Sequence, residues 1–107
     1  MLRSPGGLLF CLTLAEPQPR MARSDAPVLD QVCLDVPTAL LDAETAFWAA
    51  VLDVEPVASA TAATFRPLPR DPALPVRILL QDVGAGEQVS AHLDLATDDR
   101  VAEVARH

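Results

Sequence analysis

The chain has 107 residues, which is enough for one small domain with a modest core and too few for two complete domains. Fifteen acidic side chains outnumber eight basic ones, and the net charge of −7 argues against nucleic acid, because this charge would repel a phosphate backbone. No apolar run approaches the roughly 18 residues of a membrane span, so we expect no membrane partner either.

The composition also indicates a source and a compartment. All eight basic residues are arginine, as expected for a GC-rich, bacterial genome. The two cysteines, Cys11 and Cys33, lie in apolar runs and are too few for a disulfide scaffold. We therefore expect two buried free thiols and a cytoplasmic location.

The first 27 residues allow more than one interpretation. A turn at Pro5-Gly6-Gly7 and the apolar run 8–14 predict a short buried strand. Arg3 and the apolar residues 7–15 could instead form a secretory signal, but the turn favours the strand. Residues 15–27, rich in proline and polar side chains, are predicted to be a linker.

A strand and a helix are predicted next. In residues 28–36 (VLDQVCLDV) the alternation places apolar side chains on one face, with Asp30 as the exception. From 40 to 52 the apolar spacing becomes that of an amphipathic helix. Asp42 and Glu44 lie near its positive N-terminal end, where acidic side chains are favourable.

The second half predicts further strands and a last helix. Residues 57–66 supply one or two strands, 77–83 form another, Gly84-Ala85-Gly86 makes a hairpin turn, and 89–96 form the next strand.

A helix is then predicted from Thr97 to His107. Thr97 is its expected cap, and Val101, Val104 and Ala105 form its expected buried stripe.

This order predicts an α+β fold with a weak internal repeat. The strand and helix at 28–52 correspond to those at 89–107, which aligns Gln31 with His92. A repeated strand-helix start is a stronger signal than any single motif in this chain.

The chain resembles one family. The segments LDQVCLDVP, DAETAFWAAVLD, PVRILLQDV and AHLDLATDDRVAEVARH are similar to the glyoxalase-like branch of the vicinal oxygen chelate superfamily. The resemblance covers about three quarters of the chain and implies βαβββ modules around a cupped sheet, with an incomplete second repeat here. It divides the chain into residues 1–14, resembling the last strand of a preceding module, the linker 15–27, and a truncated glyoxalase-like domain at 28–107.

The resemblance also implies a divalent metal, with ligands on the first and late strands of each unit. Matched by position, Gln31 and His92 are the candidate ligands, and Cys11 stands where a glutamate ligand is frequent. Zinc, nickel, iron and manganese suit such a ligand set, in which the metal acts as a Lewis acid. The alternative is that His92 is a hydrogen-bonded strand histidine without a metal.

Three further residues are candidates for lining a ligand pocket: Phe47, Trp48 and Cys33. The two aromatic residues end a helical stripe and are most simply core residues, but in a cupped fold they could also form the floor of a cavity. Cys33 has no basic neighbour in sequence that would lower its pKa, so a nucleophilic role is disfavoured. Asp94, Asp98 and Asp99 lack the spacing of a calcium loop.

The function is therefore expected to be the binding or transformation of a small oxygenated molecule, with a possible glyoxalase- or dioxygenase-type activity. Two alternatives remain: a non-catalytic protein of the same fold that sequesters a ligand without metal, and a gene fragment without function. We expect a homodimer or pairing with a further module, because an open sheet edge needs a partner.

Overall fold

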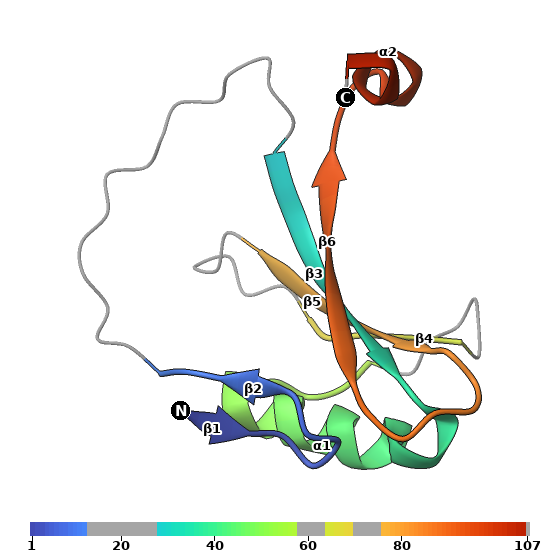
Figure 1. The fold of residues 1–107 in the computed structure, drawn as a ribbon. Coiled ribbons are helices and arrows are strands. Elements are labelled where there is room, and N and C mark those ends of the chain that lie inside the picture. The colour runs from blue at the N-terminus through green and yellow to red at the C-terminus, as the bar shows by residue number, and fades with distance from the viewer. Residues whose placement is uncertain (13–27, 58–63, 70–75, 107) are drawn as a thin grey trace.

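The computed structural model describes residues 1–12, 28–57, 64–69 and 76–106 (Figure 1). A four-stranded sheet carries the fold in the order β4-β5-β3-β6, and a two-stranded hairpin made of β1 and β2 lies beside helix α1. The elements are β1 (Leu2–Arg3), β2 (Leu9–Phe10), β3 (Val28–Val36), η1 (Thr38–Leu40), α1 (Leu41–Leu52), β4 (Phe65–Pro67), β5 (Arg77–Asp82), β6 (Ser90–Ala96) and α2 (Arg100–Arg106). This mixed content confirms the predicted α+β class.

Strand β3 is central because it pairs on both sides, parallel to β5 and antiparallel to β6. The helical crossover through α1 allows the parallel pairing, since a short hairpin cannot join parallel strands. A register shift between Leu29 and Gln31 interrupts the pairing with β6. Beyond that shift, successive β3 side chains alternate between the two faces of the sheet.

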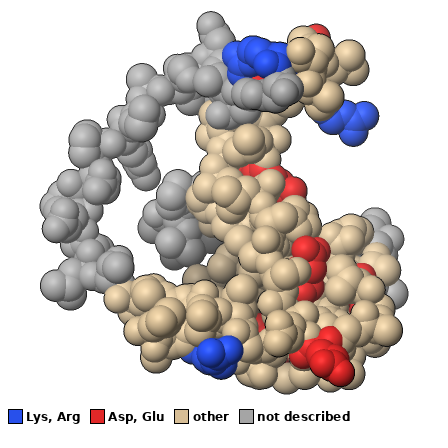
Figure 2. Space-filling model, viewed as in Figure 1, with Lys and Arg blue, Asp and Glu red and all other residues tan. Residues whose placement is uncertain are grey.

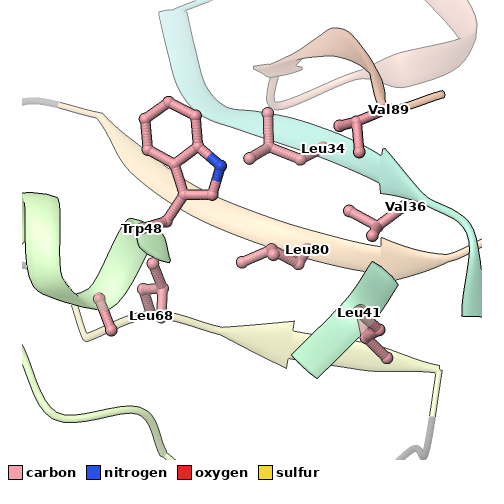
Figure 3. Packing of buried hydrophobic residues seen from close by; sticks show 8 residues of the cluster. Leu34, Val36, Leu41, Trp48, Leu68, Leu80 and Val89 are labelled. Carbon is pink, nitrogen blue, oxygen red and sulfur yellow. The ribbon is translucent and has the colours of Figure 1, made fainter. Parts of the chain in front are cut away.

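The core lies between one face of the sheet and helix α1. Leu34 and Val36 of β3 and Leu80 of β5 pack with Trp48 of α1 and with Leu68, as Figure 3 shows. Full burial of a leucine or valine stabilises a fold by about 1.5–3 kcal/mol. The predicted core face of β3 is therefore confirmed at Leu34 and Val36.

Helix α1 begins after the 3-10 turn η1 and ends at Asp53. Asp42 and Glu44 lie in its first turn, as predicted, close to the unpaired backbone amides there. Asp53 has a left-handed backbone with φ 54°, and its amide donates to the carbonyls of Ala49 and Ala50. This arrangement closes the helix as a C-terminal cap.

Glu44 joins three parts of the molecule. Its side chain is fully buried and accepts hydrogen bonds from the backbone N–H of Gly6 at 2.5 Å and from Trp48 Nε1 at 2.8 Å. A Cβ at position 6 would come within 2.3 Å of Val89 Cγ2, so only glycine allows this close approach. Glu44 thus anchors the β1-β2 hairpin to the helix and to the core tryptophan.

The hairpin differs from the predicted strand at 8–14. Only Leu9–Phe10 form a strand there, and they pair with β1 rather than with the main sheet. Cys11 is exposed, so its predicted burial was wrong, whereas Cys33 is buried and both thiols are free. The predicted linker at 15–27 lies outside the described residues.

The turn at Gly84 does not form a hairpin, contrary to the prediction. Strands β5 and β6 both pair with β3, which lies between them, so the connection crosses the end of β3. Gly84 has a positive φ of 81°, and its carbonyl accepts from the amide of Thr38. The Thr38 hydroxyl donates to Asp82 at 2.6 Å, and this bond is the main cause that holds the pKa of Asp82 below its usual value.

The last helix also differs from its prediction. It spans Arg100–Arg106, and Asp99 rather than Thr97 caps it, since Asp99 Oδ1 accepts from the amide of Ala102. Val101 and Val104 are 77% and 71% exposed instead of buried. The reason is that α2 continues beyond the end of β6, away from α1 (Figure 1).

The region between α1 and β5 is described only in part. Strands were predicted over residues 57–66, and β4 (Phe65–Pro67) overlaps only the end of that segment; residues 58–63 lie outside the described part. Within the described residues, no helix combines the length and apolarity that crossing a membrane requires.

We expect Glu44→Gln to lower the free energy of unfolding by about 1–3 kcal/mol. A glutamine side chain can accept through only one of its two polar ends, so either Gly6 N–H or Trp48 Nε1 would lose its buried acceptor. Urea unfolding followed by Trp48 fluorescence measures the change. Asp42→Asn, at an exposed acid in the same turn, is the control, and equal losses in both variants would contradict the role of Glu44.

Candidate metal and ligand site

Polar side chains gather on the face of the sheet opposite helix α1. The face follows from the alternation along β3, which directs Gln31, Cys33 and Asp35 away from the core. Their direct partners across the antiparallel pair are Asp94, His92 and Ser90 of β6. Figure 2 shows acidic side chains in red along the sheet.

His92 lies between two carboxylates. Its Nδ1 is 3.0 Å from Asp35 Oδ2, and its Nε2 is 3.6 Å from Asp94 Oδ1. The hydrogen bond to Asp35 is the main cause that raises the pKa of His92, and the negative charges of Asp35 and Asp94 act in the same direction against a desolvation effect. This environment favours any positive charge at the ring, whether a proton or a cation.

Gln31 is engaged at both ends of its amide. Its Nε2 donates to Asp94 Oδ2 at 2.5 Å, and its Oε1 accepts from Arg77 Nε at 2.9 Å. Arg77 also forms an ion pair with Asp30, with 3.4 Å between Nη2 and Oδ2. The amide oxygen, which is the atom of glutamine that would ligate a metal, therefore already has a cationic partner.

Cys33 lies buried in the same face, directly opposite His92. Its thiol donates to Gln81 Oε1 over 3.6 Å. Burial, followed by the negative charges of Asp35 and Asp94, raises the pKa of Cys33 to about 11. The thiol is therefore protonated at neutral pH, which agrees with the expectation that Cys33 is not a nucleophile.

Three of these side chains could hold a metal together. Cys33 Sγ, a ring nitrogen of His92 and a carboxylate oxygen of Asp94 lie within 4.8 Å of one another. Sulfur, imidazole and carboxylate donors suit zinc and related divalent metals. Sequence reasoning selected His92 but gave Asp94 no role in a metal site, although alternation along β6 places both on one face.

The candidate pocket residues do not share one pocket. Phe47 and Trp48 lie on the helix side of the sheet and form an aromatic cluster with Phe10, whose centroid is 5.8 Å from that of Phe47 and 5.0 Å from that of Trp48. Cys33 faces the opposite side of β3, as the period of the strand requires. Trp48 belongs to the buried core.

Phe47 does line a groove. The groove has a volume of about 320 Å³, lies between the hairpin and α1, and is mainly apolar; its lining residues are Leu2, Arg3, Phe10, Leu12, Phe47 and Val51. A volume near 300 Å³ is at the lower end of the range for small-molecule sites.

Comparison with known families agrees with this architecture. The sequence profile described as a glyoxalase-like domain matches residues 31–107, which is more than half of the chain. The chain therefore belongs to the glyoxalase-like domain family. A comparison with curated proteins gave no significant match.

Proposed function

We propose that the chain binds a small oxygenated molecule on the polar face of β3, β5 and β6, with a divalent metal held through His92. Membership of the glyoxalase-like family supports the class of ligand. The observation that carries the metal proposal is the position of His92 between Asp35 and Asp94. A histidine that binds a metal commonly donates its other ring N–H to a carboxylate, and Asp35 is placed to accept it.

The residues of this face have separate roles in the proposal. A bound metal would supply Lewis-acid polarisation of a substrate oxygen. Asp35 orients the imidazole, and Gln31 orients Asp94 through its amide N–H. Arg77, about 40% exposed, is the cationic group nearest to Gln31 and would attract an anionic ligand to this end of the face.

We also propose that the chain catalyses a reaction of the glyoxalase or dioxygenase type. The high pKa of Cys33 argues for metal-assisted chemistry rather than for attack by a thiolate. Gln31 and His92 were the two ligands expected from the sequence. Gln31 could join the metal ligands only by releasing Arg77, so we propose His92 as the principal ligand of the two.

We expect the His92→Ala variant not to retain Zn²⁺. The zinc content is measured by elemental analysis of protein that has been loaded with Zn²⁺ and then desalted. Asp35→Asn should weaken Zn²⁺ affinity about tenfold to a hundredfold, because the imidazole loses its orienting carboxylate. His107→Ala, at the other histidine of the chain, is the control, and full metal retention by His92→Ala would overturn the assignment.

A second function, capture of a ligand without metal, is favoured by the apolar groove beside Phe10 and Phe47. This groove and the polar face lie on opposite sides of β3, so a ligand there would not contact His92. Arg3, the cation among the described lining residues, would suit an apolar molecule that carries one negative charge.

The dye anilinonaphthalene sulfonate has this chemistry and tests the second function. We expect its fluorescence to rise on binding, to be insensitive to a chelator, and to fall several-fold in Leu12→Ser, because Leu12 is a 73% exposed lining residue. Val57→Ser, at an exposed valine outside the groove, is the control. Equal dye binding by both variants would exclude the groove as the site.

We also propose that the chain pairs with a second copy of itself in the cytoplasm. Strand β6 is an edge of the described sheet, and Leu93 and Leu95 on it are 64% and 59% exposed where α1 no longer covers the apolar face. An edge strand with exposed apolar side chains favours association. The two free thiols agree with a reducing compartment.

Analytical ultracentrifugation tests the pairing. We expect a dimer for the unaltered chain and a monomer for Leu93→Asp, because a carboxylate would have to be buried in the interface. Val57→Asp should remain dimeric. A monomer at all concentrations for the unaltered chain would contradict the proposal.

A further inference from the structure

The positions of Cys33, His92 and Asp94 follow from strand pairing. Cys33 is directly opposite His92 in the antiparallel pair, and Asp94 follows His92 by two residues on the same face. Side chains of directly opposed residues are close neighbours, with Cβ atoms about 4.5–5.5 Å apart. The backbone thus brings a sulfur, an imidazole and a carboxylate together without a loop.

Each of the three side chains has a second group that orients it. Asp35 holds Nδ1 of His92, so Nε2 is directed toward Asp94 Oδ1. Gln31 holds Oδ2 of Asp94, which leaves Oδ1 on the side of the imidazole. The thiol of Cys33 donates a hydrogen bond to Gln81 Oε1, and a Cys33 thiolate would instead accept from the N–H of the Gln81 amide after that amide turns over. Such outer partners are a common feature of metal sites.

The distances between the three donor atoms are close to the distances between the ligand atoms of a bound zinc ion. Zinc bonds of about 2.0–2.3 Å in a tetrahedron separate the ligand atoms by roughly 3.3–3.8 Å. The three donors already lie within 4.8 Å, so they need to approach one another by about an ångström. His92 and Asp94 are partly exposed and can move, while Cys33 is fixed in the sheet.

We propose that Cys33, His92 and Asp94 form a zinc site, with Cys33 as thiolate, His92 as imidazole and Asp94 as carboxylate ligand. Three protein ligands leave a fourth position open for water or for an oxygen of a bound molecule, as in catalytic zinc sites. The inference rests on the proposed role of His92 and replaces Gln31 by Cys33 and Asp94. Gln31 becomes a positioning residue, because its oxygen is held by Arg77 and its N–H by Asp94.

Cobalt(II) tests this ligand set, because a cobalt-thiolate bond gives a charge-transfer absorption that imidazole and carboxylate ligands do not give. We expect Co²⁺ to bind the full chain with this absorption. Cys33→Ser should abolish the absorption and weaken Co²⁺ affinity at least tenfold, and Asp94→Asn should weaken affinity while keeping the absorption. Circular dichroism checks that each variant is folded.

Cys11→Ser, at the other cysteine of the chain, is the matched control and should keep the absorption. If Co²⁺ binds through His92 without thiolate absorption, the Cys33 assignment is overturned while the proposed function stands. If the absorption is lost in Cys11→Ser instead of in Cys33→Ser, the Cys33 assignment is also overturned and the proposed function still stands. If the full chain binds no Co²⁺, both the cluster and the metal-assisted function fail.

Discussion

The two-residue period of strand β3 separates two chemical environments that the rest of the structure depends on. Leu34 and Val36 face the helix and complete the core, whereas Cys33 and Asp35 face the polar side. A shift of the β3 pairing register by one residue would exchange its two faces and bury the carboxylate of Asp35 against Trp48. The burial of Leu34 and Val36 therefore determines which donors are available to a ligand.

The hairpin at the N-terminus depends on a different interaction. Glu44 is an acidic residue in the first turn of α1, where the helix dipole favours it, but it is also completely buried. Its two hydrogen bonds satisfy the backbone of Gly6 and the indole of Trp48 together. The same interaction sets one wall of the apolar groove, because the hairpin that it anchors carries Leu2 and Phe10.

The polar face has a negative character that a metal would offset. Burial, and after it the charges of Asp35 and Asp94, raises the pKa of Cys33, and the hydrogen bond to Asp35 raises the pKa of His92. A divalent ion would reverse the effect on Cys33, since a metal stabilises the thiolate that the carboxylates disfavour. Arg77 lies beyond Gln31 and balances part of the charge through Asp30.

The sequence by itself determined the α+β class, the strand at 28–36, a helix over 40–52 that the structure places at Leu41–Leu52, and the family, because these follow from local periodicity and from motifs within single segments. It also singled out His92 as a candidate ligand. Only the tertiary structure decided the partners of that residue, since the connection from β5 crosses the end of β3 and places β6 beside β3 instead of in a hairpin with β5. Gln31 and Asp94, which are 63 positions apart, meet through that pairing, as do Cys33 and His92. The partners of β3 depend on which of its edges β5 occupies, because β6 then pairs with the other edge. No local sequence pattern determines that arrangement.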